Sequence, residues 1–597
     1  MKLSDYISNF MAAQGIRHVF VVTGGAAAHL IDSVAKNPDI DYICTQHEQA
    51  AAMAADAYSR VTANIGAAIA TSGPGATNLI TGACCAYYDS IPVIYITGQV
   101  GTFRSRKGTG VRQLGFQEAD IVDIFKPFTK YAVLVDDPRK IRYELEKATY
   151  IARSGRPGPV LIDVPDNLQR EDIDPIALEP FVPPQERETH GRLAERVAKC
   201  IPMLEKAQRP VVILGWGIRL ARAEEEAREL VDKLGFPVLP TWATMDILPS
   251  DHPLVAGSFG LHGTRYGNFT VQNADLVLSI GCRLDTHLTG SPVTTFAREA
   301  IKIIVDIDSS ELDKFNESGM NVDVAIYADA KDFLDTINNK IDGIVTQDTV
   351  EWKKRIAGWK NKYPICPPDY YQEEGVNPYV FVKILSRESS QGDVIFVDTG
   401  CGVAWMLQAF DFKEGQRLFS AFNNTPMGYS LPASIGASFA LGRQPVTCIT
   451  GDGGLQMNIQ ELATIIRHNL PIKIFLLNNH GYSMIRQTQD QWLDSKYEAS
   501  TVEGGLAFPD FVKVAEAYGY KTVTINSNRE LQKCVQEVLN SIGPVFCNVV
   551  ISPEHRVTPQ VKFGRPIEDA EPLLSREEFM GNMIIRPLDV SLEQDGI

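Results

Sequence analysis

The sequence predicts an α/β protein of three doubly wound α/β domains with mostly parallel sheets. A chain of 597 residues is too long for a single hydrophobic core. Short apolar runs recur along it, and stretches with helical spacing separate them, which is typical of parallel sheets covered by helices on both faces. The clearest expected strands cover residues 18–22, 65–70, 91–97, 160–164, 211–214, 274–280, 301–307, 394–397, 446–450 and 472–477.

Two polar, Pro-containing stretches divide this alternation. They lie near residues 174–189 and 363–378, and the strand–helix pattern restarts after each. We therefore expect an N-terminal domain over 1–180, a central domain over 190–345, a C-terminal domain over 373–555, and a tail over 556–597.

The composition excludes several classes of protein. Lys plus Arg (57) falls below Asp plus Glu (73), and the formal charge of −16 opposes general binding to nucleic acid or anionic membranes. The ten cysteines show no repeated CxxC spacing, so neither a disulfide framework nor a zinc site is expected. The N-terminus has no signal-peptide pattern, and no apolar run approaches the roughly 20 residues of a membrane helix. We expect a cytoplasmic protein without a nucleic-acid or membrane partner.

The sharpest chemical signal lies in the third domain. Gly451-Asp452-Gly453-Gly454 follows one expected strand and Asn478-Asn479 follows the next, with helically spaced apolar residues between them. In such a βαβ unit both motifs emerge at the carboxyl edge of the sheet, where ligands of open α/β sheets bind. The glycines let backbone amides approach a diphosphate, and Asp452 and Asn479 offer hard oxygen ligands suited to Mg²⁺. Either pair alone would indicate only a turn; the two on successive strands favour a ligand site.

The spacing of these motifs resembles the thiamine-diphosphate binding motif. Further segments resemble acetolactate (acetohydroxyacid) synthases and their relatives over nearly the whole chain. These segments are His47-Glu48-Gln49, the run from Thr71 to Asn78, Gly98-Gln99-Val100, Phe116-Gln117-Glu118, Thr129-Lys130 and Arg156-Pro157-Gly158-Pro159-Val160. The resemblance implies the thiamine-diphosphate-binding fold, with a pyrimidine-binding N-terminal domain and a diphosphate- and magnesium-binding C-terminal domain. It also implies an enzyme that decarboxylates pyruvate or another 2-oxo acid, joins the product to a second carbonyl substrate, and assembles as a homodimer or homotetramer.

The resemblance also implies roles for individual residues. Glu48 would hydrogen-bond the aminopyrimidine ring of the cofactor and promote removal of the thiazolium C2 proton, although a lone Glu is more often a solvated helix terminus. Met427 would hold the cofactor bent, whereas a lone Met is more often core filler. Gln117 and Lys130 would line the substrate approach. The cofactor contacts implied are Gly24, Gly25, Gly400, Cys401, Gly402, Thr425, Met427, Gly451, Asp452, Gly453, Gly454, Asn479, Gly481 and Tyr482, with Asp452, Asn479 and Gly481 as magnesium ligands.

Flavin binding by the central domain stays open at this point. Gly215-Trp216-Gly217 follows an expected strand, but two glycines at a strand–helix junction are a weak signal. The residues that together resemble an FAD site are Gly215, Gly217, Gly260, His262, Arg283 and Asp306. Related decarboxylases keep this domain without flavin. Arg283 would contact either the flavin or the carboxylate of the second substrate.

The acceptor also stays open. Synthases of this family carry a Trp where this chain has Thr488, which leaves a larger and more polar pocket. The tail segment 567–572 resembles synthase-like proteins of bacterial surface-sugar pathways, so acyl transfer to a ketosugar is one alternative. A flavin-linked pyruvate oxidase is a second, and a regulatory protein without turnover is a third that the presence of Glu48, Asp452 and Asn479 opposes.

Overall fold

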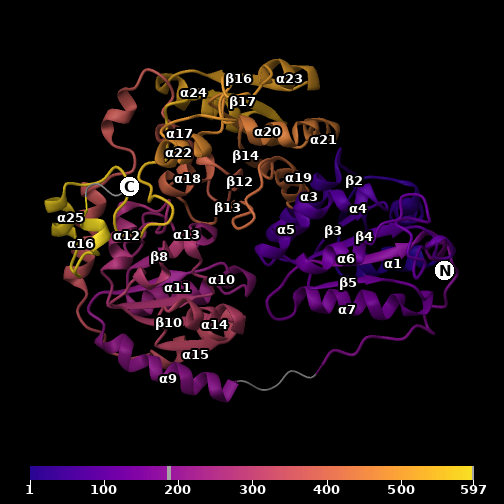
Figure 1. The fold of residues 1–597 in the computed structure, drawn as a ribbon, viewed down its shortest axis with the longest axis horizontal. Coiled ribbons are helices and arrows are strands. Elements are labelled where there is room, and N and C mark those ends of the chain that lie inside the picture. Colours follow the sequence, from indigo (N-terminus) through magenta and orange to yellow (C-terminus); the bar gives the residue numbers. More distant parts are fainter. Residues whose placement is uncertain (185–189, 594–597) are drawn as a thin grey trace.

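The structure is a computed structural model that describes residues 1–184 and 190–593 (Figure 1). Residues 185–189, at the end of the first expected linker, and residues 594–597 of the expected tail lie outside the described residues. As predicted, the chain forms three sheets in sequence order, of six, five and six strands. Neighbouring strands within each sheet are parallel.

The first sheet has the order β2-β1-β3-β4-β6-β5 and the third has the order β13-β12-β14-β15-β17-β16. Numbered within each domain, both orders are the same, so the two domains repeat one topology. In the first domain the strands are β1 (His18–Val21), β2 (Asp41–Cys44), β3 (Gly66–Ala70), β4 (Val93–Gln99), β5 (Tyr131–Leu134) and β6 (Val160–Pro165). In the third they are β12 (Val394–Val397), β13 (Arg417–Phe419), β14 (Val446–Gly451), β15 (Ile472–Asn478), β16 (Lys521–Ile525) and β17 (Val545–Val550).

The central sheet has the order β11-β10-β9-β7-β8. Its strands are β7 (Pro210–Leu214), β8 (Val238–Pro240), β9 (Leu276–Ile280), β10 (Ile301–Asp306) and β11 (Val324–Tyr327). Its helices are α9 (His190–Lys206), α10 (Gly217–Leu220), α11 (Glu224–Leu234), α12 (Arg265–Gln272), α13 (Thr286–Thr289), α14 (Ser309–Ser318), α15 (Ala330–Lys340) and α16 (Val350–Lys362).

Helices cover the outer two sheets in the same way. The N-terminal ones are α1 (Leu3–Ala13), α2 (Ala28–Lys36), α3 (Glu48–Thr62), α4 (Pro74–Asn78), α5 (Ile80–Tyr88), α6 (Ile121–Phe125), α7 (Ile141–Arg153) and α8 (Asp166–Gln169). The C-terminal ones are α17 (Pro378–Glu388), α18 (Cys401–Ala409), α19 (Ser430–Ala440), α20 (Asp452–Met457), α21 (Leu462–His468), α22 (Ser483–Trp492), α23 (Phe511–Tyr518) and α24 (Asn528–Asn540). Among the described helices, none is long and apolar enough to cross a membrane.

The first and third domains meet through α3 and α19, which lie side by side between the two sheets (Figure 1). Each is the helix that follows the second strand of its domain. Their backbones approach so closely that a Cβ added to Gly436 would lie 2.0 Å from the carbonyl oxygen of Ala54, so only glycine fits there. The buried Tyr429 hydroxyl, one residue before α19, donates to Asp56 on α3. The contact is therefore tightly packed and also polar.

The tail returns to the central domain. Helix α25 (Arg576–Asn582) lies beside α12 and α16 (Figure 1), and the Trp359 indole nitrogen donates to Asn582 at 2.9 Å. Arg265 donates to the carbonyl oxygens of Ala570 and Pro572. A last helix, α26 (Asp589–Leu592), follows. The tail thus covers the middle domain with a buried apolar face.

Candidate active site

Both outer sheets reverse their strand order between the first and third strand, which are β1 and β3 in one domain and β12 and β14 in the other. Ligands of open α/β sheets bind at the carboxyl ends of the strands at such a switch point. Gly24-Gly25 follows β1 and the run from Thr71 follows β3, while Glu48 follows the neighbouring strand β2; these residues form an N-terminal half-site. Gly400 follows β12 and Asp452 follows β14, while Asn479 follows the neighbouring strand β15; these residues form a C-terminal half-site.

The N-terminal half-site centres on Glu48, the first residue of α3. Its side chain is buried, and Oε2 accepts a hydrogen bond from the Asn78 amide nitrogen at 2.9 Å. A Cβ added to Gly75 would lie 3.2 Å from Oε1, so the loop after β3 packs against the carboxyl. The neighbouring His47 caps α3, because its Nδ1 accepts from the backbone N–H of Gln49 at 3.1 Å. A carboxyl group is thus held at one end of the sheet in a fixed direction.

Gln117 lies against the same loop. A Cβ added to Gly73, which has φ +58°, would lie 2.7 Å from the Gln117 carbonyl oxygen. Both Gly24 and Gly25 follow β1; Gly24 has no room for a side chain beside Thr71, whereas Gly25 faces open space. The structure therefore brings these residues to the edge of the sheet that carries Glu48.

Lys130 makes its contacts elsewhere in the N-terminal domain. Its ammonium donates to the carbonyl oxygens of Ile151 and Ser154 at the C-terminal end of α7. Burial lowers the pKa of Lys130 to about 8. The observed contacts are those of a helix-capping cation.

The C-terminal half-site centres on Asp452, the first residue of α20 and only 2% exposed. Its Oδ1 accepts from the N–H of Gly453 at 2.7 Å, and Oδ2 accepts from the N–H groups of Asn479 and Gly481, both at 3.2 Å. Burial raises the pKa of Asp452 to about 6. The Asn479 amide nitrogen donates to Ser483 at 2.6 Å, which leaves the amide oxygen as an acceptor. The predicted ligands from two successive strands are therefore in direct contact.

These residues fit a magnesium–diphosphate group. A carboxylate, an amide oxygen and a backbone carbonyl are the hard donors that Mg²⁺ prefers. Among the described residues no cluster of three or more His, Cys, Asp or Glu side chains could hold a metal, so phosphate oxygens would have to complete the coordination. The loop also leaves space only for backbone, because a Cβ on Gly453 would lie 2.2 Å from the ring of Tyr482 and 2.8 Å from Cε of Met427.

Asp398, directly after β12, organises the rest of this half-site. Its carboxylate accepts from the N–H groups of Gly428 and Tyr429 and from the hydroxyl of Thr450. Burial raises the pKa of Asp398 to about 6. The loop that carries Met427 is therefore tied to the strand ends. The sequence reasoning missed Asp398, although the position of an acidic residue at a strand end is the signal that found Asp452.

The remaining predicted contacts surround these strand ends. Gly400 has φ +87° and open space at its Cβ position, so its backbone is accessible. Cys401 and Gly402 begin α18, and burial raises the pKa of Cys401 to about 12. Thr425 has φ +43°, which lies in the left-handed region that few non-glycine residues adopt.

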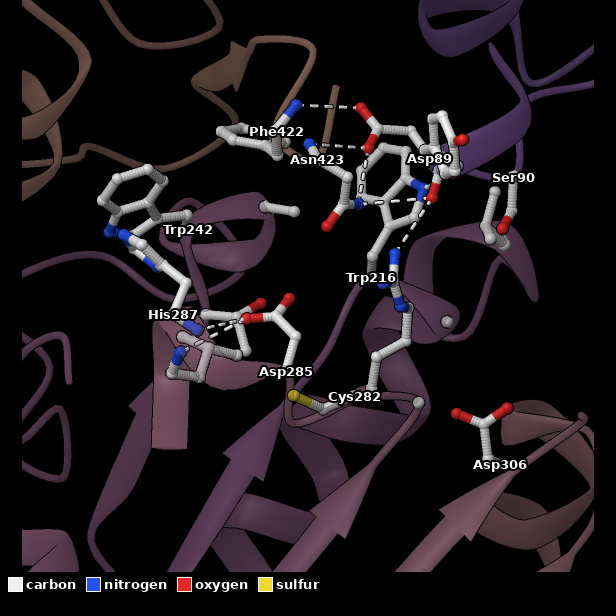
Figure 2. Close-up of a pocket in the computed structure, with 18 of the residues that line it drawn as sticks. Asp89, Ser90, Trp216, Trp242, Cys282, Asp285, His287, Asp306, Phe422 and Asn423 are labelled. Carbon is white, nitrogen blue, oxygen red and sulfur yellow. Dashed lines mark hydrogen bonds between the residues drawn. The ribbon is translucent and has the colours of Figure 1, made fainter. Parts of the chain in front are cut away.

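Four of the six predicted flavin residues line one cavity of about 650 Å³ (Figure 2). Gly217, His262, Arg283 and Asp306 contribute to its wall, and Thr399, Gly400 and Thr425 of the C-terminal domain line it as well. Gly215 and Gly260 do not line the cavity themselves but pack behind residues that do: a Cβ on Gly215 would lie 2.2 Å from the carbonyl oxygen of Gly281, and one on Gly260 would lie 2.6 Å from that of His287.

All three domains meet at this cavity (Figure 2). Asp89 of the first domain accepts from the N–H groups of Phe422 at 2.9 Å and Asn423 at 3.1 Å, and its carbonyl oxygen accepts from the Trp216 indole at 2.9 Å. At the end of β10, burial raises the pKa of Asp306 to about 6. Asp89, Asp285 and Asp329 also line the cavity. A cavity of this size, with glycines in its wall and an acidic side chain at the end of β10, fits a nucleotide cofactor.

The cavity also holds a histidine pair that the sequence did not predict. His262 Nδ1 lies 2.8 Å from His287 Nε2, and Trp242 stacks edge-on against His287. Burial lowers the pKa of both imidazoles, so this wall is neutral rather than cationic. Three arginines, Arg153, Arg156 and Arg283, line the cavity, and Arg283 donates to the Tyr88 carbonyl at 3.2 Å.

Comparison with known proteins agrees with this architecture. Residues 1–124 match the N-terminal TPP binding domain of thiamine pyrophosphate enzymes, residues 197–337 match their central domain, and residues 398–549 match their C-terminal TPP binding domain. The chain belongs to the thiamine pyrophosphate enzyme family, and it is a thiamine-diphosphate-dependent enzyme.

Within that family the chain is similar to acetolactate synthases. The acetolactate synthase large subunit of Pyropia yezoensis is 35% identical over 559 residues, which cover 92% of each chain. A probable acetolactate synthase large subunit of Methanocaldococcus jannaschii is 34% identical over 583 residues, 96% of each chain. The acetolactate synthase of Arthrospira platensis is 33% identical over 578 residues. These relatives do not favour the alternatives of a ketosugar acceptor or a flavin-linked oxidase.

Proposed function

We propose that the enzyme decarboxylates pyruvate and joins the resulting two-carbon unit to a second carbonyl substrate, as an acetolactate synthase does. The observation that carries this proposal is that the two outer domains share one strand order and each carries a half-site at the same edge of its sheet. One presents the buried carboxyl of Glu48, and the other presents Asp452 with the glycines around it. Relatives that bear the synthase name over more than nine-tenths of the chain support it.

Each half-site would supply a different function. Bound thiamine diphosphate supplies an electron sink for loss of CO₂. Asp452, the Asn479 amide oxygen and the Gly481 carbonyl would hold Mg²⁺, and the backbone of Gly451, Gly453 and Gly454 would lie against the diphosphate. Glu48 would move a proton at the aminopyrimidine ring. Further contacts would come from Gly24, Gly25, Gly400, Cys401, Gly402, Thr425 and Tyr482.

Met427, Gln117 and Lys130 would affect how the cofactor and the substrate fit into the site. Met427 would press on the bound cofactor from the loop that Asp398 holds. Gln117 would line the substrate approach; the packing of its backbone carbonyl against Gly73, on the loop that also meets Glu48 at Gly75, supports this. For Lys130, proposed as a second residue of that approach, the carbonyl contacts at the end of α7 favour an indirect effect through the fold of the domain.

Product analysis tests the reaction. Purified enzyme with thiamine diphosphate, Mg²⁺ and pyruvate should release CO₂ and form acetolactate, and added 2-oxobutyrate or aldehydes should report the acceptor by mass spectrometry. Acetate or acetyl phosphate as the main product, with reduction of a bound flavin, would instead favour an oxidase. Absence of CO₂ release from a cofactor-saturated protein would contradict the proposal.

Flavin is proposed as a second cofactor. The cavity lined by Gly217, His262, Arg283 and Asp306 supports it, since its walls combine tight glycine contacts with a buried carboxyl suited to ribose hydroxyls. The absorbance spectrum of the purified protein and of the supernatant after heat release tests it. Asp306→Asn should weaken flavin retention. Asp329→Asn, a carboxyl on the same cavity wall that caps α15, serves as the matched control.

A homodimer or homotetramer is also proposed. Exposed apolar side chains on the loop that carries Gln117 support it: Phe103 is 72% exposed, Leu114 58% and Phe116 85%. A second copy that covers this loop would bring its own C-terminal half-site to Glu48. Light scattering during gel filtration measures the assembly. The proposed division of the chain stays at 1–180, 190–345, 373–555 and 556–597, and a cytoplasmic location stays a prediction.

A further inference from the structure

The C-terminal domain touches the backbone just before Glu48 through one buried side chain. Glu461 ends the 3-10 helix η8 (Ile459–Glu461), on the segment that follows α20. Its side chain is fully buried, and Oε1 accepts from the backbone N–H of Gln46 at 2.8 Å. The backbone N–H of His47 also donates to this carboxyl. The other oxygen, Oε2, accepts from the Thr464 hydroxyl at 2.8 Å.

These contacts fix the residues that lead into α3. The first N–H groups of a helix and of its entry segment have no partner within the helix, and a carboxylate there is favoured by the helix dipole. Glu461 supplies that carboxylate from another domain. The Thr45 hydroxyl donates to the His47 carbonyl at 3.0 Å, which adds a local constraint on the same turn. The backbone dihedral angles of residues 46 and 47 set the direction in which the next side chain leaves the helix.

We propose that Glu461 is a positioning residue for Glu48. It holds the entry turn of α3 so that the Glu48 carboxyl keeps the direction needed for proton transfer. The inference rests on the proposed catalytic role of Glu48. Docking of the two domains does not depend on this contact alone, because α3 and α19 already pack closely at Gly436.

Hydrogen–deuterium exchange on the cofactor-free, full-length protein tests the contact directly. Glu461→Ala should increase exchange at the amides of residues 46 and 47 by at least about tenfold, the equivalent of one lost hydrogen bond. Glu461→Gln should keep most of the protection, since a carboxamide oxygen can still accept and its nitrogen can donate to Thr464. Unchanged protection in Glu461→Ala would overturn the proposal.

A second measurement on the loaded enzyme tests positioning. Glu461→Ala should slow exchange of the cofactor C2 proton by about 10²-fold, as expected for a misplaced catalytic group, with cofactor affinity within about threefold of wild type. Glu461→Gln should restore the exchange rate. Lost amide protection with an unchanged C2 rate would overturn the positioning role. An unchanged C2 rate in Glu48→Gln would instead refute the proposed function.

The matched control is Asp246→Asn. Asp246 is also buried, and its carboxyl accepts from the N–H of Leu418 at 2.9 Å, which joins the central and C-terminal domains as Glu461 joins the outer two. This variant should leave unchanged both the amide exchange of residues 46 and 47 and the exchange rate of the cofactor C2 proton. If Glu461→Ala does not fold, Thr464→Val removes the partner of Oε2 and should give a smaller increase of the same kind; no increase in that variant would count against the proposal.

Discussion

Replacing Glu48 by Gln separates the chemistry of this side chain from its packing. The two side chains have the same shape, so the contact with Gly75 is kept. The carboxamide oxygen of Gln can still accept from the Asn78 amide at the 2.9 Å position of Oε2. Only the charge and the capacity to exchange a proton are lost. The change in the free energy of unfolding should be about 1 kcal/mol or less, the scale of weakening one hydrogen bond.

The expected loss in turnover is much larger. A positioned proton-transfer group contributes about 10²–10⁴ in rate, which corresponds to roughly 3–5 kcal/mol of activation free energy. Steady-state CO₂ release from pyruvate measures turnover. Titration with thiamine diphosphate and a thermal melt verify that the cofactor binds and that the protein is folded.

Glu144→Gln is the matched control for this experiment. Glu144 lies in the same domain, has the same 9% exposure as Glu48, and accepts a hydrogen bond from the Tyr131 hydroxyl. It should keep turnover near the wild-type value. If Glu48→Gln turned over within about threefold of wild type while folded and cofactor-bound, Glu48 would have no catalytic role and the proposed site would need another base.

Three further predictions concern the metal, the assembly and the pH dependence of stability through Asp163, a buried residue of β6. Asp452→Ala should abolish the magnesium dependence of thiamine diphosphate affinity, because the remaining donors are neutral; a variant affinity that still responds to Mg²⁺ would contradict the metal assignment. Mixing inactive Glu48→Gln and Asp452→Ala proteins under subunit exchange should restore about a quarter of wild-type activity if each site uses two chains, and none if each site lies within one chain. Burial raises the pKa of Asp163 to about 7, so the folded chain keeps a proton that the unfolded chain releases near pH 4. Stability should therefore fall as pH rises from about 4 to 7, and the thermal transition of Asp163→Asn should show less of this fall.

The sequence predicted the interior of each sheet better than its edges. The strands expected from apolar runs are all present, with bounds within two residues of those observed. The strands without a clear run include both edge strands of every sheet. β2 shows why: only Ile43 of its four residues is buried, because one side of an edge strand faces solvent. The internal strand β17 carries the polar Asn548 within its apolar run, which weakens the same signal.

Site residues were predictable where a local motif marks them. Asp452 and Asn479 follow strands and carry glycines or a second polar residue beside them. Asn78 ends the run from Thr71 that resembles the synthases, but neither it nor Glu461 has a local signal for its contact, since their partners Glu48 and Gln46 are brought to them only by the fold. Lone polar residues in apolar helices are common, and a single sequence gives no measure of which of them meet.

The repeated topology places the two half-sites at equivalent positions of the outer domains. Because the outer domains share one strand order, their switch points are equivalent, and their equivalent helices α3 and α19 pack against each other. Within one chain, the residue that reaches the backbone just before Glu48 from the C-terminal domain is Glu461, on the segment after α20. Asp452 makes no such contact among those described. In the proposed homo-oligomer, the contact that joins Glu48 to a diphosphate site would come from a second copy that covers the exposed loop around Gln117. The internal contact would then set the geometry of Glu48, and the contact between copies would place it against the cofactor.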